Sequence, residues 1–388
     1  MTGSIDAETG VIGVGTVGAA LLWQLARRGV PAIGFERYAP GHDRAAVGGE
    51  SRLFRVAYAE GARYTGLLRR ALGQWRELEA AAGLPLLGAC GGLSIGRPEQ
   101  DYIRNLLASA RESGTPVEVL DRPAMRARYP QHRLLEGEVG VLDEQAGFLR
   151  CEAAVVAAAD QAERHGARVL RRTEIDAVVE HDDHVEIRAG EQRWRVRQAV
   201  LCAGSWTGRF LPDGLRRRLR PHRLLLTWFL ARRPEEYTPA RFPIFIRESA
   251  GVHLYGAPSL DGAGVKVAGA VPAMPVPDPD AIERRHSPDE IAAVSAAVAE
   301  LLPGLHPDPI RADAFTDLYT PDGDPLVGRI GGGRLSIASG FSGRGFKYAS
   351  ALAADVADML ANGTGAPLDF MAPERFAAGD PPDPGKDG

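Results

Sequence analysis

The start of the chain combines an apolar stretch, a glycine-rich turn, a helix and a second apolar stretch, and this order constrains the fold more than any other feature. Val11–Gly18 reads VIGVGTVG, and the apolar-striped helix that follows stops at Gly29. Ala32–Phe35 is the second apolar stretch and leads directly into Glu36. This is the order of a βαβ unit, which predicts a parallel sheet. Because Glu8–Gly10 is polar for a buried strand, we expect the first strand to be short or to begin irregularly.

The glycine pattern of this turn predicts a dinucleotide-binding, Rossmann-like domain. Gly13 permits a tight turn, Gly15 lets the backbone approach a pyrophosphate, and Gly18 lets helix and strand pack closely. Glu36 stands where a carboxylate binds ribose hydroxyls, which disfavours a 2′-phosphate. A GxGxxG turn alone is a weak signal, but here the whole unit is present in order. The predicted cofactor-binding residues of this unit are Gly13, Gly15, Thr16, Val17, Gly18, Glu36 and Arg37.

A second glycine-rich junction lies near the other end of the chain and favours FAD over NAD. Arg334–Ala338 is strand-like, Ser339–Lys347 reads SGFSGRGFK, and an alanine-rich helix follows. The N-terminus of that helix is suited to stabilise negative charge on a reduced flavin ring, a need that nicotinamide enzymes lack. Alternatively, Gly340, Gly343 and Gly345 only form a turn.

Lysine is rare in this chain, and its placement is informative. Only three of the 46 basic residues are lysine, and two of these, Lys266 and Lys347, lie in apolar runs close to glycines. Lysine provides a compact point charge whose pKa shifts on burial, which a guanidinium does not. Both lysines are therefore candidates for a functional site. Alternatively, both extend their charged ends into water from a strand or a helix.

Five segments carry a family resemblance: Gly13–Gly18, Gly48–Gly61, Ala203–Trp206, Lys266 and Gly340–Lys347. Together they resemble the monomeric sarcosine oxidase and N-methyltryptophan oxidase branch of the FAD-dependent amine oxidoreductases related to D-amino-acid oxidase. The resemblance implies an FAD enzyme that oxidises an amine beside a carboxylate, with hydride passing to flavin and electrons passing to molecular oxygen to give hydrogen peroxide. The further cofactor-binding residues that it implies are Ser51, Arg52, Ala203, Gly204, Trp206, Gly340, Gly343, Arg344, Gly345, Phe346 and Lys347.

The resemblance also implies roles for four cationic residues, all of which are predicted to be catalytic. Arg55 and Lys347 match the pair that holds the substrate carboxylate, for which arginine is suited by its bidentate geometry. Arg52 matches a residue close to the flavin ring. Lys266 matches the lysine that promotes electron transfer to oxygen by stabilising the negative charge that forms there. Alternatively, Arg52 and Arg55 form salt bridges with Glu50 or with Glu60, which we interpret as a support residue.

Three positions depart from the family pattern. The family's flavin-attaching cysteine, six residues before Pro321, corresponds to Phe315 here, so we predict FAD that is bound without a covalent bond. An aromatic residue beside the substrate corresponds to Asp317, and a histidine corresponds to Ala270. These changes predict a larger and differently charged pocket and a substrate larger than sarcosine. Asp317 pairs either with a cationic group of the substrate or with an arginine such as Arg247. The predicted substrate-binding residues are Arg55, Lys347, Asp317 and Tyr255.

The order of strand-like and helical segments predicts an α/β protein with an α+β second domain. Residues 1–86, 151–220 and 311–388 are expected to form a discontinuous, doubly wound, Rossmann-like FAD-binding domain. Residues 87–150 and 221–310 are expected to form an inserted substrate domain with a mixed sheet. The tail at residues 377–388 is rich in Asp, Pro and Gly and is predicted to be disordered.

Composition excludes several other classes of function. The net charge of −4, without a basic stripe, gives no footprint for nucleic acid. There is no apolar run of roughly 20 residues and no signal-like N-terminus, so we expect a cytoplasmic protein without a membrane partner. The three cysteines share no metal-type spacing, and we expect no metal. His222 and His253 are not predicted to be catalytic. A chain with two domains and no coiled-coil pattern is compatible with a monomer.

Two alternatives to an amino-acid or N-alkyl-amino-acid oxidase stay open at this point. One is an FAD-dependent dehydrogenase that passes electrons to a carrier, in which case Lys266 is structural. The other is a catalytically silent flavin-binding protein, which is compatible with the missing cysteine and the polar first strand.

Overall fold

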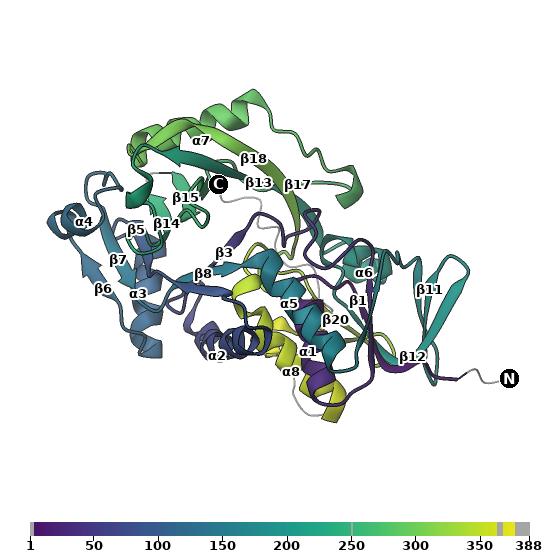
Figure 1. Cartoon of the computed structure of the whole chain (residues 1–388). Coiled ribbons are helices and arrows are strands. Elements are labelled where there is room, and N and C mark those ends of the chain that lie inside the picture. The colour runs from purple at the N-terminus through teal and green to yellow at the C-terminus, as the bar shows by residue number, and fades with distance from the viewer. Residues whose placement is uncertain (1–3, 250, 363–367, 377–388) are drawn as a thin grey trace.

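The structure is a computed structural model that describes residues 4–249, 251–362 and 368–376. In Figure 1, several long helices gather at the lower centre beside one sheet, while a second sheet with a helix on its outer side lies at the top. The predicted disordered tail, residues 377–388, lies outside the described residues.

The first unit is built on an eight-stranded sheet. Its strands are β1 (Ala7–Ile12), β2 (Ala32–Glu36), β9 (Arg168–Arg171), β10 (Ala177–Glu180), β11 (Val185–Ala189), β12 (Gln192–Leu201), β19 (Leu326–Ile330) and β20 (Leu335–Ser339). Strands β9, β2, β1, β12 and β20 pair in that order and run parallel, as the βαβ pattern predicts. Strands β10, β11 and β19 extend the sheet with antiparallel pairs.

Successive residues of the parallel strands enter two separate hydrophobic cores, because side chains alternate between the faces of a sheet. Val11 and Val200 belong to one core, whereas their neighbours Ile12 and Leu201 belong to the other. The first core also contains side chains of the four long helices α1 (Thr16–Arg27), α2 (Thr65–Ala82), α5 (Cys151–Arg164) and α8 (Ala349–Asn362). Among the described residues, none of these helices reaches the second core. The unit is therefore Rossmann-like but not doubly wound as expected, because these helices share one face and residues 177–201 form a β10-β11-β12 meander.

The first strand is regular, which corrects the expectation of a short or irregular start. Strand β1 pairs in parallel register with β12 from Ala7 and with β2 from Thr9. The polar residues fit because Gln198 donates a hydrogen bond to the buried Thr9 hydroxyl over 3.4 Å. Gly10 leaves room for Ile187, whose Cδ1 would lie 2.5 Å from a Cβ at that position.

The second unit is a mixed, nine-stranded sheet, as expected for the substrate domain. Its strands are β5 (Gly92–Gly96), β6 (Glu118–Leu120), β7 (Val139–Asp143), β13 (Arg220–Ala231), β14 (Ile244–Ser249), β15 (Val252–Ala257), β16 (Val265–Ala268), β17 (Met274–Pro275) and β18 (Leu305–Tyr319). The accompanying helices are α3 (Asp101–Ser113), α4 (Arg122–Arg128) and α7 (Pro288–Leu301), whereas the short α6 (Asp213–Arg216) precedes β13. The pair β5-β14 is parallel and its neighbours are antiparallel.

The expected domain boundary at residues 310/311 falls inside strand β18. Residues 311–319 pair with β13 in the second sheet instead of returning directly to the flavin unit. The strand is long because β13 offers an uninterrupted antiparallel partner from Arg220 to Trp228. Its C-terminal end consequently lies against the first unit, where Thr316 hydrogen-bonds Ser205.

A small third sheet lies between the two units. It pairs β3 (Ser51–Phe54) with β8 (Gly147–Arg150), and β8 with β4 (Leu87–Ala89). Strand β3 contacts β15 of the second sheet and the turn of 3₁₀ helix Phe346–Tyr348. Residues 51–54 are thereby placed at the junction of both units, where the family resemblance expects the active site.

Candidate active site

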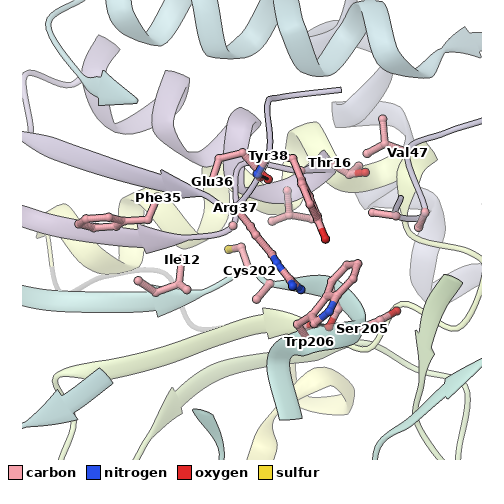
Figure 2. Close-up of a pocket in the computed structure, with 18 of the residues that line it drawn as sticks. Ile12, Thr16, Phe35, Glu36, Arg37, Tyr38, Val47, Cys202, Ser205 and Trp206 are labelled. Atoms are coloured by element: carbon pink, nitrogen blue, oxygen red, sulfur yellow. Dashed lines mark hydrogen bonds between the residues drawn. The ribbon is translucent and has the colours of Figure 1, made fainter. Parts of the chain in front are cut away.

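The first cavity lies at the carboxyl ends of the parallel strands, where open α/β sheets bind their ligands. Figure 2 shows Glu36 and Arg37 at the end of β2, with Arg37 extending towards Trp206 on the opposite side. The predicted cofactor-binding residues that line this cavity are Gly13, Gly15, Thr16, Val17, Glu36, Arg37, Ala203, Gly204 and Trp206. Residues expected to contact FAD from the segments Gly13–Gly18 and Ala203–Trp206 thus line one cavity.

The glycines of the turn fit a bound dinucleotide. Gly13 has φ +93°, and a Cβ there would lie 2.6 Å from the Cys202 carbonyl oxygen. Gly18 lines no cavity and packs against the Gly13 carbonyl, as close helix–strand packing requires. A Cβ at Gly15 would meet nothing within 4 Å, so this position faces open space at the N-terminus of α1. Helix α1 has no side-chain N-cap, which leaves its first amides available for a pyrophosphate.

Glu36 is held at the end of β2 by two backbone amides. Its carboxylate accepts from Val14 N at 3.0 Å and from Tyr38 N at 2.9 Å. Burial raises the pKa of Glu36, while these two amides lower it. His42 lies 3.5 Å from the same carboxylate, and burial lowers the pKa of His42 to about 4, so this histidine is neutral at pH 7. The remaining lone pairs of Glu36 are suited to ribose hydroxyls.

A segment of the second unit binds residues that line this cavity. We call residues 271–287 the strap. Asp280 of the strap accepts from Arg37 Nη1 at 2.6 Å, from Trp206 Nε1 at 2.7 Å and from Arg209. These three bonds lower the pKa of Asp280 to about 2, against the opposing effect of burial. Arg284 of the strap also pairs with Asp43 at 3.0 Å.

The second cavity, of about 540 Å³, collects the residues predicted to act on the substrate. Ala46 and Asp317 line both cavities, so the two are neighbours. The predicted residues that line the second cavity are Ser51, Arg52, Arg55, Tyr255, Lys266, Asp317, Gly343, Arg344, Phe346 and Lys347. Ala270 does not line it and packs against a hydrophobic core, which corrects the expectation that this position enlarges the pocket.

Arg55 and Lys347 are buried cations that have no carboxylate partner among the described residues. Arg55 Nη1 donates to the Tyr102 hydroxyl at 3.2 Å, and its Nε is buried without a partner. Lys347 Nζ donates to the Arg344 carbonyl at 2.7 Å and to the Tyr58 hydroxyl at 3.4 Å. Burial, and then the nearby Arg55, lowers the pKa of Lys347 to about 7. A buried guanidinium with an unused donor beside an ammonium is suited to hold an anion.

Lys266 and Arg52 donate to backbone carbonyls of one loop. Lys266 Nζ, on strand β16, donates to Gly49 O at 3.0 Å and to Ser51 O at 2.6 Å. Burial, and then Arg52, lowers the pKa of Lys266 to about 7. Arg52 donates to Ala46 O, Gly48 O and Ser51 O over 2.6–2.7 Å. Both lysines are buried, so the alternative in which their charged ends reach water is wrong.

The proposed salt bridges of Arg52 and Arg55 are also absent from the described part of the chain. Glu50 pairs with Arg311 at 2.6 Å and accepts from Trp228 Nε1 at 3.0 Å. Glu60 lies 3.6 Å from Arg344, which is compatible with a support role. The two arginines therefore keep their positive charge for groups other than these acids.

The residues of the glycine-rich loop before α8 fall into two groups: some line the second cavity, and others only form the turn. Gly343, Arg344, Phe346 and Lys347 line the second cavity. Gly340 and Gly345 line neither cavity: Gly340 has φ +69° and a Cβ there would lie 2.8 Å from Thr320 Cγ2, while Gly345 packs on Phe341. The turn interpretation therefore describes Gly340 and Gly345, although both were predicted to bind the cofactor.

Asp317 is not paired with Arg247, which corrects one of the two alternatives. Arg247 and Glu138 form a fully buried ion pair. Asp317 accepts instead from Leu318 N and from Gly343 N, both at 2.8 Å. Phe315, two residues earlier on the same face of β18, is buried against Gly48 and Gly49.

Several lining or bridging residues were missed by the sequence analysis. Tyr102 and Asn105 reach the cavity from α3, and Tyr319 from β18. Asp280 in the strap binds the lining residues Arg37 and Trp206 of the first cavity. No motif marks these residues; only the two-residue spacing of Phe315, Asp317 and Tyr319 on one strand signals a shared face.

The fold and the two cavities define a flavin-type oxidoreductase: a dinucleotide pocket lies beside a second cavity lined by cations. Among the described residues there is no group of three or more His, Cys, Asp or Glu side chains placed to hold a metal ion. Likewise, no helix in the described ranges combines the length and the apolar character needed to cross a bilayer.

The chain belongs to the family described as FAD dependent oxidoreductase (DAO), which matches residues 8–359. It is similar to the monomeric sarcosine oxidase of Streptomyces avermitilis, with 32% identity over 375 residues that cover 95% of this chain and 97% of that protein. It is similar to the N-methyl-L-tryptophan oxidase of Yersinia pestis, with 28% identity over 379 residues that cover 95% of this chain and 98% of that protein. The resemblance found in the five segments is confirmed, and the family supplies FAD as cofactor.

A solved structure supports the same fold. NikD, described as an unusual amino acid oxidase essential for nikkomycin biosynthesis, superposes with a TM-score of 0.85 at 21% identity, covering 95% of this chain and 98% of that chain. The predicted α/β fold, with a Rossmann-like unit and a second mixed-sheet unit, is confirmed by this match and by the sheet topology.

The strap predicts how FAD is retained. We expect Asp280→Asn to weaken FAD binding about threefold to tenfold, because the amide loses charge-assisted bonds to Arg37 and Arg209 at a partly exposed site. Titration of apoprotein with FAD, followed by flavin fluorescence, measures this. Asp308→Asn, an exposed strand carboxylate away from both cavities, is the control. Unchanged or tighter binding by Asp280→Asn would show that the strap does not hold the cofactor.

Proposed function

We propose that this protein is an FAD-dependent oxidase of an amino acid or N-alkyl amino acid larger than sarcosine. The observation that carries the proposal is the convergence of Arg55, Lys347 and Lys266 on one cavity next to the dinucleotide pocket. Arg55 and Lys347 offer unpaired positive charge for a carboxylate. The two relatives named above, a sarcosine oxidase and an N-methyltryptophan oxidase, support this substrate class.

The side chains of the second cavity have separate roles in the proposed reaction. FAD, when bound, accepts hydride from the carbon beside the amine and passes the electrons to molecular oxygen, which yields hydrogen peroxide. Arg55 and Lys347 orient the substrate by its carboxylate, and Tyr255 borders the same space. Arg52 lies at the junction with the nucleotide pocket, and Lys266 provides positive charge for the reduction of oxygen.

We further propose that FAD is held without a covalent bond. Phe315 occupies the position of the family's attaching cysteine and has no nucleophilic atom. The three cysteines are placed elsewhere: Cys151 and Cys202 are buried, and burial raises the pKa of Cys151 to about 11. Cys202 borders the first cavity near Gly13, and burial raises its pKa to about 12. A protonated, buried thiol is a poor nucleophile.

Denaturation tests the mode of attachment. We expect acid precipitation of the yellow protein to leave a colourless pellet and to release intact FAD into the supernatant, where chromatography identifies it. Flavin that stays with the pellet would contradict the proposal, and single Cys→Ala variants at positions 90, 151 and 202 would then locate the bond.

The Lys266→Met variant tests the oxidase assignment. Under anaerobic mixing with sarcosine, N-methyl aromatic amino acids, cyclic imino acids and D-amino acids, we expect one member of this panel to bleach the flavin of both wild type and variant at similar rates. After air is admitted, we expect reoxidation and peroxide release to be about tenfold slower or more in the variant, because the charge that stabilises reduced oxygen is missing. Stopped-flow absorbance separates the two half-reactions.

Arg27→Met is the matched control for Lys266→Met. It removes a cation that lies 4.7 Å from the Trp23 ring but lines neither cavity. If both half-reactions slow equally in Lys266→Met, the lysine has another role. If reduced wild type persists in air, the protein is a dehydrogenase that needs a carrier. A flavin that no panel member bleaches would favour a substrate outside the panel or a silent site.

The Arg55→Ala variant tests the carboxylate site. We expect the dissociation constant of a simple carboxylate such as 3,3-dimethylbutyrate to rise by a factor that corresponds to about 2–5 kcal/mol, since a buried carboxylate loses its main partner. Calorimetric titration of the FAD-loaded protein gives this constant. Arg128→Ala, which breaks an exposed ion pair with Glu118, serves as control. Equal affinity of Arg55→Ala and wild type would place the carboxylate elsewhere.

A further inference from the structure

Strand β18 presents three alternate side chains to the second cavity. Phe315, Asp317 and Tyr319 all line it, as the two-residue period of a strand requires. Thr316 points the other way and hydrogen-bonds Ser205 of the first unit. Asp317 is thus fixed by the strand itself, in the middle of a face that is otherwise aromatic.

Asp317 differs from the other carboxylates that line this cavity. Glu60 lies 3.6 Å from Arg344, and Glu248 forms a close ion pair with His253. Asp317 has no cationic side-chain partner among the described residues and accepts only from two backbone amides. A carboxylate offers about four acceptor positions, so about two remain unused. Asp317 therefore keeps a negative charge without a cationic partner and about two acceptor positions for a ligand.

The cavity also limits where each end of a zwitterionic ligand can bind. Arg55 and Lys347 take a carboxylate, as argued above. An ammonium group cannot lie beside these cations without repulsion, and its burial requires an opposite charge or hydrogen-bond acceptors. Glu60 Oε2 is also buried without a partner, but Arg344 already offsets the charge of that residue. Asp317 is the lining acid whose charge is not offset by an ion pair in the described structure.

We propose that Asp317 binds the protonated amine of a zwitterionic amino-acid substrate and accepts its proton before the C–N bond is oxidised. This inference rests on the proposed function. The proton moves from the ammonium nitrogen to a carboxylate oxygen of Asp317, and the nitrogen recovers its lone pair. The neutral amine can then release hydride from the adjacent carbon to FAD, which leaves an iminium. The chain thereby selects primary and secondary amines that are cationic in water.

The surroundings of Asp317 support a proton acceptor. Burial raises the pKa of Asp317, against the lowering effects of the two amides and of Arg52 on β3. The other titratable groups towards this part of the cavity are Tyr319 on β18, Tyr255 on β15 and Arg344 in the loop before α8. His222 on β13 pairs with Asp317 in the strand register and contacts the Tyr319 ring, and burial lowers the pKa of His222, which disfavours its cationic form. Burial raises the pKa values of Tyr319 and Tyr255, so both tyrosines are neutral at pH 7. Asp317 is therefore the acid of this group that can change charge on binding an ammonium.

A pair of ligands that differ only in charge tests the proposal without catalysis. Betaine carries a trimethylammonium group and a carboxylate and cannot become a neutral amine, while 3,3-dimethylbutyrate has the same shape with carbon in place of nitrogen. Calorimetric titration of FAD-loaded protein gives both dissociation constants. We expect wild type to prefer betaine by about tenfold or more, and Asp317→Asn to abolish this preference while it changes dimethylbutyrate binding by about twofold or less.

Matched variants separate this inference from the proposed function. Glu248→Gln, an acid-to-amide change in the same cavity, is expected to leave the ratio of the two constants unchanged. Arg55→Ala is expected to weaken both ligands, so failure of the carboxylate site is visible independently of the ratio. Retained dimethylbutyrate binding by Asp317→Asn also shows that the variant is folded. A wild type without preference for betaine, or a ratio that changes with Glu60→Gln but not with Asp317→Asn, would overturn the proposal.

The proton transfer has its own readout once a substrate is known. We expect the rate of anaerobic flavin reduction by Asp317→Asn to increase towards the higher pH at which the amine is neutral in solution, while wild type keeps its rate near neutral pH. An identical pH profile in both proteins would restrict Asp317 to charge recognition and contradict its role as proton acceptor.

Discussion

The loop at residues 46–51 solvates the buried ammonium of Lys266 and the partly buried guanidinium of Arg52, and the architecture around the site depends on this interaction. Lys266 and Arg52 have no carboxylate partner in the described structure, and a buried charge without compensation is costly. Backbone carbonyls of Ala46, Gly48, Gly49 and Ser51 compensate both. Carbonyl groups stabilise a cation without neutralising its charge. The positive field therefore remains directed at the cavity, where an anion or reduced oxygen can use it.

Turning these carbonyls inward requires an unusual backbone, and both units hold it in place. Gly49 has φ +98°, and Glu50 has φ +68°, a conformation that is uncommon outside glycine. From the first unit, Glu152 at the start of α5 accepts from Gly49 N at 2.8 Å and from Glu50 N at 3.0 Å. From the second unit, Trp228 and Arg311 bind the Glu50 side chain. The cation site thus exists only where the two sheets meet, which explains why it lies at their junction.

The sequence predicts local elements well here and predicts pairings poorly. The sequence predicts a helix over Thr65–Ala82 from its apolar spacing and the following Gly83, and α2 has those bounds because both signals are local. The resemblance, which covers nearly the whole chain, selected four cations that line one cavity, while their roles stay predictions. The partners of Asp317 and Arg247 could not be predicted, because Gly343 and Glu138 approach them only through long-range packing. The meander at residues 177–201 was missed for a similar reason. Its strands pair antiparallel, and their amino-acid sequence does not show whether they pair antiparallel with each other or parallel across a helix.

Phe315 and Gly48 explain how the site is built without a cysteine at that position. A Cβ at Gly48 would overlap the Phe315 ring, so the aromatic side chain fills the space that a side chain at residue 48 would take. The Gly48 carbonyl on the same residue accepts from Arg52. The ring therefore supports, from the second sheet, the backbone that compensates the arginine. Packing by the Phe315 ring occupies this position, and under the proposed non-covalent binding the cofactor is retained by the first cavity and by the contacts of Asp280 with the lining residues Arg37 and Trp206.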